Sequence, residues 1–281
     1  MSNDASLDIA HLRQWIGREE TVEDIVSEDL ARKFHAMLSL NGPVPKAGDP
    51  APRIIHFCLG QPAVPPAGLG RDGHPARGGF LPPVGLPRRM WAGGAFTFHD
   101  ELKVGDLVTK TSRIADVVMK DGRTGPLCFV TVNHHIAVDG RGILDERQDI
   151  VYRSDDTGAV KSAEPAPQGS HTRPFDTTTT TLFRYSALTF NGHRIHYDRR
   201  YAIEVEGYGG LVVHGPMQAT LLHNFAAEIK GALPSRFSFR GLSPLIDDDD
   251  CHLHAVPGDG PMKLWTARTG GPVAMQAEAH W

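Results

Sequence analysis

Hydrophobic residues recur at three- and four-residue steps over residues 8–40, the spacing of an amphipathic helix. An Asn-Gly-Pro run at 41–43 then gives a strong stop signal. Prolines are so frequent over 43–87 that little regular structure fits there, although residues 54–59 are apolar enough for a short strand or the start of a buried helix. A loop this long inside a domain is usually functional or mobile.

After the proline-rich loop the pattern becomes one of short runs rich in β-branched residues, separated by turn residues, which predicts antiparallel strands. The predicted strands are residues 95–98, 107–119, 127–135 and 149–153, then 236–239, 251–256, 263–268 and 273–281. A hairpin turn is expected at 120–123. The clearest helix lies near 215–230, because Pro216 suits its first turn and Gly231 ends it.

The two halves repeat this order of elements, and the Phe-Thr-Phe at 96–98 parallels the Phe-Ser-Phe at 237–239. Between the halves, residues 154–181 are mostly Asp, Ser, Thr, Gly, Pro and Gln, which predicts a linker. We therefore expect an N-terminal domain at 1–153 and a C-terminal domain at 182–281. Each is of the α+β class, a helix with an antiparallel sheet.

Composition excludes several classes of protein. The 29 Lys and Arg against 33 Asp and Glu give a net charge of −4 without a basic cluster, so we expect no nucleic-acid partner. No apolar run approaches the roughly 20 residues of a membrane span, and no secretory signal is visible, so we expect a cytoplasmic protein with no membrane partner. The cysteines, which are Cys58, Cys128 and Cys251, form neither a disulfide framework nor a zinc motif. Glycine-rich nucleotide loops and a serine nucleophile elbow are absent.

Residues 182–198 combine histidines, arginines, Asn and Asp with aromatic residues, too polar a mixture for a core element. Within them, Thr-Phe-Asn-Gly-His-Arg-Ile-His-Tyr-Asp at 189–198 resembles the hydratase motif of MaoC-like R-specific enoyl-CoA hydratases, which are hot-dog-fold enzymes. That motif has a catalytic Asp, then Asn-Pro, the catalytic His and another Asp.

The resemblance extends over most of the chain to a subgroup of long, double hot-dog dehydratases. This subgroup includes type-two 3-hydroxyacyl-thioester dehydratase, mesaconyl-C4-CoA hydratase and itaconyl-CoA hydratase. The other segments that carry the resemblance are residues 15–18, 88–94, 149–153 and 206–217. It implies a double hot-dog fold, in which two antiparallel sheets each wrap around a central helix.

The resemblance also implies a hydro-lyase that needs no cofactor and no metal, because CoA is part of the substrate. It places His196 on the catalytic His and Asn191 on the catalytic Asp. An Asn side chain can hold a water but cannot take its proton. We therefore expect His196 to carry the proton and Asn191 to orient the water. The oxyanion-binding N–H of the family falls on Gly215, where a helix N-terminus would stabilise a developing enolate.

Further residues are expected to assist catalysis or to contact the substrate. His193 stands where the motif has Asn and is expected to assist, as is Asp198, which either sets the tautomer of a histidine or caps a strand end. Substrate contacts are expected from three arginines near the motif or the proline-rich loop, against the alternatives of ion pairing or plain surface charge: Arg184, Arg88 and Arg89. The N-terminal half is expected to lack a complete site, because residues 43–95 do not contain the Asn-x-His-x-x-His spacing.

Four functions are compatible with a hot-dog fold, and the hydratase-like motif disfavours the last of them, a thioesterase. The main hypothesis is reversible hydration of a small branched dicarboxylyl-CoA, either mesaconyl-C4-CoA or itaconyl-CoA, which the nearby arginines favour. The alternatives are an (R)-3-hydroxyacyl-thioester dehydratase of fatty-acid metabolism, a non-catalytic thioester-binding hot-dog subunit in which Asn191 marks lost activity, and a thioesterase. The expected partner is an acyl-CoA substrate, and the oligomeric state, a homo-oligomer included, stays open.

Overall fold

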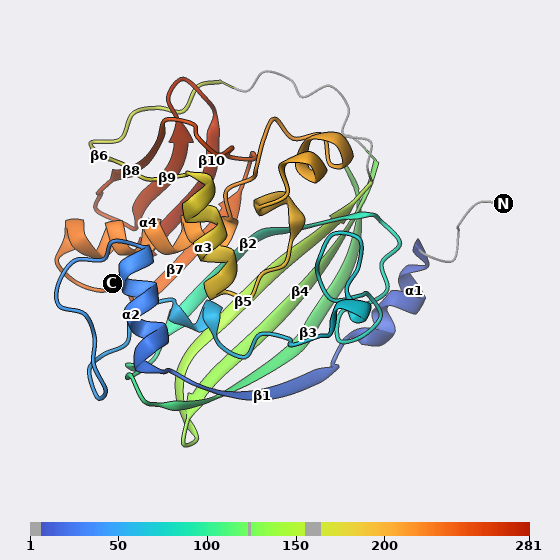
Figure 1. Cartoon of the computed structure of the whole chain (residues 1–281), viewed down its shortest axis with the longest axis horizontal. Coiled ribbons are helices and arrows are strands. Elements are labelled where there is room, and N and C mark those ends of the chain that lie inside the picture. Colours follow the sequence, from blue (N-terminus) through green and yellow to red (C-terminus); the bar gives the residue numbers. More distant parts are fainter. Residues whose placement is uncertain (1–6, 123–124, 155–163) are drawn as a thin grey trace.

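The strands of the chain form one ten-stranded antiparallel sheet in the computed structural model, which describes residues 7–122, 125–154 and 164–281 (Figure 1). The strands are β1 (Glu19–Ile25), β2 (Arg88–Phe98), β3 (Leu107–Gly122), β4 (Gly125–Val138), β5 (Arg141–Arg153), β6 (His171–Pro174), β7 (Arg236–Gly241), β8 (Cys251–Val256), β9 (Met262–Arg268) and β10 (Val273–His280). Their order across the sheet is β1-β3-β4-β5-β2-β7-β10-β9-β8-β6. Each half of the chain therefore contributes one half of the sheet.

Four α-helices accompany the sheet within the described residues: α1 (Ile9–Leu12), α2 (Glu28–Met37), α3 (Thr179–Leu188) and α4 (Gly215–Lys230). The predicted helix near 215–230 is confirmed by α4, which has Pro216 in its first turn and ends at Gly231 in the left-handed region. Leu222 and Phe225 of α4 are buried against the sheet of the second half. None of the described helices is long and apolar enough to cross a membrane.

Several shorter elements, and no single long helix, pack in the buried cluster that includes β4 of the first half. Phe34 of α2, Tyr185 of α3 and Ile55 of a 3₁₀ turn at Ile55–Cys58 belong to one buried cluster with Ile136 of β4. The apolar run at 54–59 is thus a short 3₁₀ turn, and α2 packs directly on α3.

The N-terminal region differs from the single helical run expected over residues 8–40. Residues 19–25 form β1, which pairs antiparallel with the outer side of β3, so that Glu19 lies opposite Arg113 and Ile25 opposite Leu107. Backbone hydrogen bonds to a distant strand outweigh the local helical spacing here. The helical prediction was wrong for this segment.

The expected linker at 154–181 is shorter than its composition suggests. Residues 171–174 form β6, which pairs with β8 at the edge of the sheet, and residues 179–181 begin α3. Residues 155–163 lie outside the described residues, as does the tip of the hairpin expected at 120–123.

The two halves of the chain meet where their similar Phe motifs pair. Strands β2 and β7 pair antiparallel with Phe96 opposite Phe237, and the two rings stack at 6.2 Å with only 6° between their planes. The paired Phe motifs of the sequence are therefore the centre of this junction. A Cβ on Gly93 would lie 2.5 Å from the carbonyl oxygen of Phe239, so the strands can approach this closely only without a side chain there.

We predict that Gly93→Ala destabilises the protein, because its methyl group must displace backbone rather than a flexible side chain. The expected loss is about 1–3 kcal/mol in the free energy of unfolding, measured by denaturant titration. Gly241→Ala is the matched control, since its Cβ would meet nothing closer than 3.7 Å at the same junction. Equal stability of the two variants would contradict this account.

Candidate active site

The motif at 182–198 is a helix followed by turns. Helix α3 begins after Thr178, whose hydroxyl oxygen accepts the N–H of Thr181, and runs to Leu188. Beyond it, the side-chain oxygen of Asn191 accepts the backbone N–H of His193 at 2.9 Å. In the structure, Asn191 therefore shapes the turn that presents His193. Its amide oxygen has a second lone pair and its NH₂ group two donors, so the expected orienting of a water stays a prediction.

Four histidine rings lie in an unbroken series, which we call the histidine cluster: His74, His193, His196 and His214. The ring centroids are 4.3 Å apart from His74 to His193, 5.3 Å from His193 to His196 and 3.7 Å from His196 to His214. Three of them are buried, whereas the side chain of His74 stays 26% exposed. The series runs from the proline-rich loop to the beginning of α4.

The tautomer of His196 follows from its hydrogen bond. Its Nδ1 lies 2.7 Å from the carbonyl oxygen of Val212, which can only accept, so Nδ1 carries the proton and Nε2 keeps a lone pair. Burial lowers the pKa of His196 to about 4. The ring is consequently neutral near pH 7, with Nε2 available as an acceptor.

His214 connects this ring to the N-terminus of α4. Its Nε2 lies 2.8 Å from the hydroxyl of Ser186 on α3. Burial, and to a lesser extent the neighbouring rings of His196 and His193, which would repel a second positive charge, lower its pKa well below the ordinary value. The next residue, Gly215, is the first of α4, so its N–H has no partner within the helix and lies at the positive end of the dipole. A Cβ on Gly215 would meet only Met275, at 3.7 Å, so packing does not require a glycine here.

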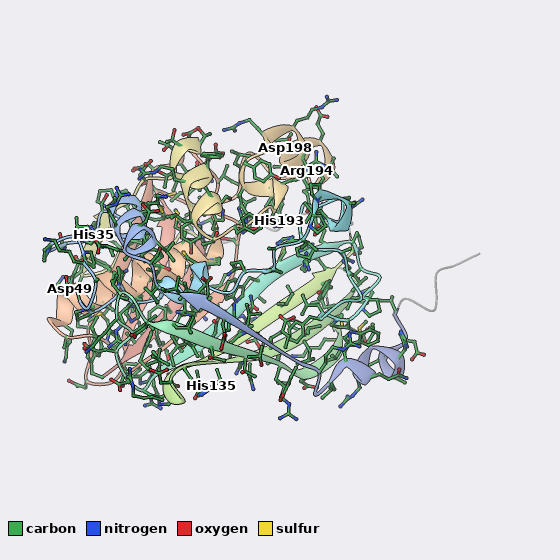
Figure 2. The ribbon with its side chains drawn as sticks, turned by 60° about the horizontal axis from the view of Figure 1, so that its bottom comes forward. His35, Asp49, His135, His193, Arg194 and Asp198 are labelled. Atoms are coloured by element: carbon green, nitrogen blue, oxygen red, sulfur yellow. The ribbon has the colours of Figure 1, made fainter. Side chains whose placement is uncertain are left out.

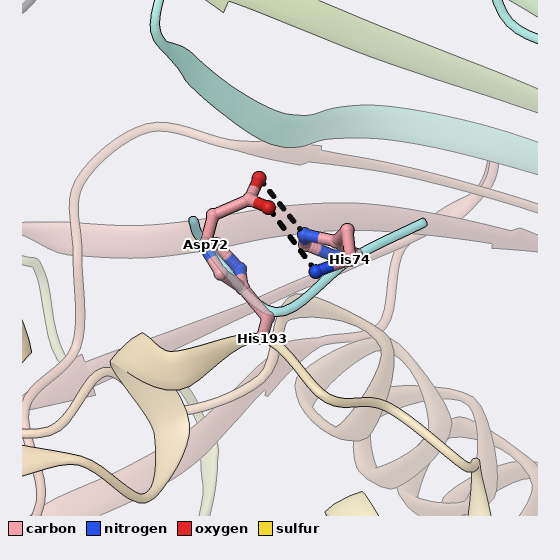
Figure 3. Close-up of side chains that lie close together, drawn as sticks. All are labelled: Asp72, His74 and His193. Carbon is pink, nitrogen blue, oxygen red and sulfur yellow. Dashed lines mark hydrogen bonds and ion pairs between the residues drawn. The ribbon is translucent and has the colours of Figure 1, made fainter. Parts of the chain in front are cut away.

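The proline-rich loop contributes a carboxylate. Asp72 accepts the backbone N–H of His74 at 3.1 Å, and its other oxygen lies 3.3 Å from Nδ1 of the same residue (Figure 3). Arg89 on β2 places Nη2 3.6 Å from this carboxylate. Burial alone would raise the pKa of Asp72, but the contacts with His74 and Arg89 outweigh it and lower the pKa, so Asp72 is ionised.

The loop meets the motif through backbone contact. Arg194 donates its N–H to the carbonyl oxygen of Asp72 at 2.9 Å. A Cβ on Gly73 would lie 1.9 Å from the carbonyl oxygen of Gly192, and one on Gly192 would lie 2.6 Å from that of Gly73. Gly73 and Gly192 thus allow the contact that brings Asp72 and His74 close to His193.

Two of the predicted arginines are buried in ion pairs. Arg88 places Nε 3.7 Å from Glu206, and Arg89 pairs with Asp72. Arg184 is exposed on α3, about 200° around the helix from Ser186, which faces the cluster. The structure therefore brings Arg89 to the site but leaves Arg184 on the outer face of its helix.

Asp198 does not set the tautomer of His196. It pairs with Arg194 at 2.7 Å and accepts the backbone N–H of Tyr201 at 3.0 Å, which caps the π-helical turn at Tyr201–Val205. Its role is that of a cap, although of a helical turn and not of a strand end. Figure 2 shows Asp198, Arg194 and His193 on the same side of the molecule.

A divalent metal ion would find three ligand atoms within 4.8 Å of one another, on Asp72, His74 and His193. The guanidinium of Arg89 lies beside the carboxylate of this set and opposes a further positive charge there. The absence of a metal from the reaction, expected from the sequence, stays a prediction.

The sequence pattern did not predict Asp72 and His74 as residues of the site. The signal that could have found them is Asp-Gly-His-Pro at 72–75, in which two chemically reactive side chains flank a glycine in a segment otherwise dominated by Pro and Gly. The site draws on both halves of the chain, and the N-terminal half contributes a carboxylate–histidine pair rather than a copy of the motif.

The chain is similar to known proteins over most of its length. A family model described as hydroxyacyl-thioester dehydratase type 2 matches residues 54–247. Mesaconyl-C4-CoA hydratase of Chloroflexus aurantiacus is 42% identical over 270 residues, which cover 94% of this chain and 95% of that protein. This similarity extends across both halves and includes all the residues of the histidine cluster within its span.

Solved structures show the same fold at low identity. A MaoC-like dehydratase of Phytophthora capsici superimposes with a TM-score of 0.71 and 13% identity, over 98% of each chain. A conserved Mycobacterium tuberculosis protein described as a double hot-dog fold gives a TM-score of 0.55 and 12% identity, over 95% of this chain and 96% of that one. The expected double hot-dog fold is confirmed. Its detail differs from the expectation, because the two halves join in one ten-stranded sheet and, among the described residues, only the second half packs on a single long helix.

We predict that Gly192→Ala lowers activity by about 10²-fold with little change in fold, because it pushes apart the two loops that position the histidines. Gly79→Ala is the matched control on the proline-rich loop, since its Cβ would meet no atom within 4 Å. Activity and circular dichroism are measured on both variants. Full activity of Gly192→Ala would contradict the importance of this contact.

Proposed function

Because this chain belongs to the hydroxyacyl-thioester dehydratase type 2 family, we propose that it is a hydro-lyase that reversibly adds water to the α,β-double bond of a small dicarboxylyl-CoA thioester. The substrate proposed first is mesaconyl-C4-CoA, and itaconyl-CoA is the related choice. The observation that carries the proposal is the His196 ring, with its tautomer set by Val212 and its neighbour His214 next to the N-terminus of α4.

The thioester oxygen is proposed to accept the N–H of Gly215. When the water oxygen bonds to Cβ, the π-electron pair moves toward this oxygen, and the helix N-terminus stabilises the enolate charge that develops. An enolate formed in this way collapses when Cα takes a proton, which restores the thioester carbonyl. The reverse sequence removes water.

The water is proposed to bind at Nε2 of His196, and the proton that it loses passes to the histidine cluster. The rings there are buried and their pKa values are lowered, so they are neutral and able to accept a proton. His193 lies between the two ends of the cluster and assists by its contacts with both neighbours. Asn191 supports this geometry by fixing the turn before His193.

The free carboxylate of the substrate needs a fixed positive partner, because burying it unpaired would cost several kcal/mol. Arg89 is the arginine that reaches the site, and its Nε has no hydrogen-bond partner among the described residues although it is buried. A planar guanidinium can grip both oxygens of a carboxylate. We therefore assign the distal carboxylate to Arg89.

The second candidate is dehydration of (R)-3-hydroxyacyl thioesters of fatty-acid metabolism, which the family favours. A non-catalytic thioester-binding subunit and a thioesterase complete the alternatives. Two assays distinguish them: absorbance of the conjugated double bond, followed with mesaconyl-C4-CoA, itaconyl-CoA, crotonyl-CoA and a long-chain 2-enoyl-CoA, and detection of released CoA. Dicarboxylyl substrates consumed without CoA release support the proposal, preference for long fatty chains favours the second candidate, and no turnover favours the binding subunit.

We predict that mesaconyl-C4-CoA or itaconyl-CoA is hydrated much more efficiently than crotonyl-CoA, and that Arg89→Lys erases this preference. The loss should fall mainly on KM, because the carboxylate itself undergoes no bond change and its contact with Arg89 is made in the ground and transition states alike. Arg184→Lys, on the outer face of α3, is the control and should keep the preference. Equal efficiencies of the wild-type protein on all three substrates would refute the assignment of a dicarboxylyl substrate.

We predict that His196→Ala lowers kcat by about 10²–10⁴-fold. In the wild-type protein the neutral ring is required and its pKa is about 4, so protonation of His196 should abolish activity as the pH approaches 4. His171→Ala, in the exposed edge strand β6, is the control for histidine removal. Near-normal turnover of a folded His196→Ala protein would show that this ring is structural.

A further inference from the structure

Of the four rings in the histidine cluster, His74 alone hydrogen-bonds a carboxylate among the described residues. The Nδ1 of His196 faces a backbone carbonyl and the Nε2 of His214 faces a hydroxyl. Asp72 holds His74 twice, through the backbone N–H and through Nδ1. Because an ionised carboxylate only accepts, Nδ1 of His74 carries a proton and Nε2 keeps a lone pair.

We propose that His74 is a second catalytic residue, which takes the proton of the attacking water, and that Asp72 is its positioning residue. The proposal rests on the hydratase function and divides between two rings the role that the sequence assigned to His196 alone. Nε2 of His196 accepts a hydrogen bond from one O–H of the water, and Nε2 of His74 takes the proton of the other. The imidazolium formed on His74 lies beside the Asp72 carboxylate, which stabilises it.

In this mechanism every proton and electron pair is accounted for. The water oxygen forms its bond to Cβ while its proton moves to Nε2 of His74, and the π-electron pair moves to the thioester oxygen at Gly215. The enolate pair then forms the Cα–H bond with the proton returned by His74, and the thioester carbonyl is restored. His74 and Asp72 end in the states in which they began.

The location of His74 agrees with this role. The loop that carries it is closed by a β-bridge between Leu69 and Pro75, and the N–H of Gly70 donates to the carbonyl oxygen of His74 at 2.7 Å. The ring is held against His193 but stays partly exposed, so a substrate can reach it.

The charged groups that act on this ring come from two elements. Asp72 on the same loop raises the pKa of His74, whereas burial, Arg89 on β2 and Arg77 on the loop lower it. The net shift is downward, so the resting ring is neutral and ready to accept a proton. The histidines that face it, His193 and His196, are neutral as well.

The first test compares Asp72→Asn and His74→Gln with the wild-type protein on mesaconyl-C4-CoA. We expect His74→Gln to lower kcat by about 10²-fold or more, and Asp72→Asn by at least about tenfold, both with little change in KM. Asp145→Asn is the matched control, because Asp145 also bonds a histidine, His135 at 2.7 Å, but in an exposed pair that lies apart from His193 in Figure 2.

The pH profile separates proton transfer from a merely structural role. Because Asp72 raises the pKa of His74, its removal should move the acid limb of kcat/KM to lower pH. A purely structural loss would lower kcat and leave this limb in place, and would overturn the proposal. So would unchanged kcat in both variants, or one equivalent of tightly bound divalent metal on Asp72, His74 and His193.

Two further readouts keep the test decisive. Nitrogen-15 NMR of the wild-type histidines should show the Nδ1–H tautomer for His74, and the Nε2–H tautomer would overturn the proposal even if neither variant folds. Wild-type turnover is measured first. Its absence on every enoyl-CoA would refute the proposed function, whereas wild-type turnover that survives both substitutions would refute only the role of His74.

Discussion

The backbone contact between Gly73 and Gly192 is the constraint on which the site depends. Each glycine lies so close to the carbonyl oxygen of the other that a Cβ on either would overlap it. Through this contact the proline-rich loop and the motif act as one unit, with Asp72 and His74 delivered from the first and His193 from the second. A loop that is rich in proline and poor in regular structure thereby holds reactive groups in a fixed place.

Burial defines the chemistry of these groups. The histidine rings are enclosed and their pKa values are lowered, so they are proton acceptors at neutral pH. The charges that remain are paired, Arg88 with Glu206 and Arg89 with Asp72. A buried pair of this kind stabilises little by itself, because desolvation offsets the attraction, but loss of one partner leaves an uncompensated charge. The pairs therefore fix the geometry of the site and add little to the stability of the protein.

The sequence predicted the parts of the molecule that local pattern determines. Helix α4 and the long hairpin strands follow from periodicity and turn residues, and the motif pointed to His196 and His193. What it did not predict depends on partners distant in the chain. Strand β1 forms because it hydrogen-bonds the edge of β3. Asp72 lies near His193 because Gly73 and Gly192 allow their two loops to come into backbone contact. No local spacing encodes such contacts.

Hydration of mesaconyl-C4-CoA in oxygen-18 water, followed by mass spectrometry, tests the central claim most directly. The account predicts that the label appears as a hydroxyl on the acyl chain of an intact CoA thioester. Label in a free carboxylate together with released CoA would instead identify a thioesterase. Unchanged, unlabelled substrate would contradict hydration of mesaconyl-C4-CoA by this protein.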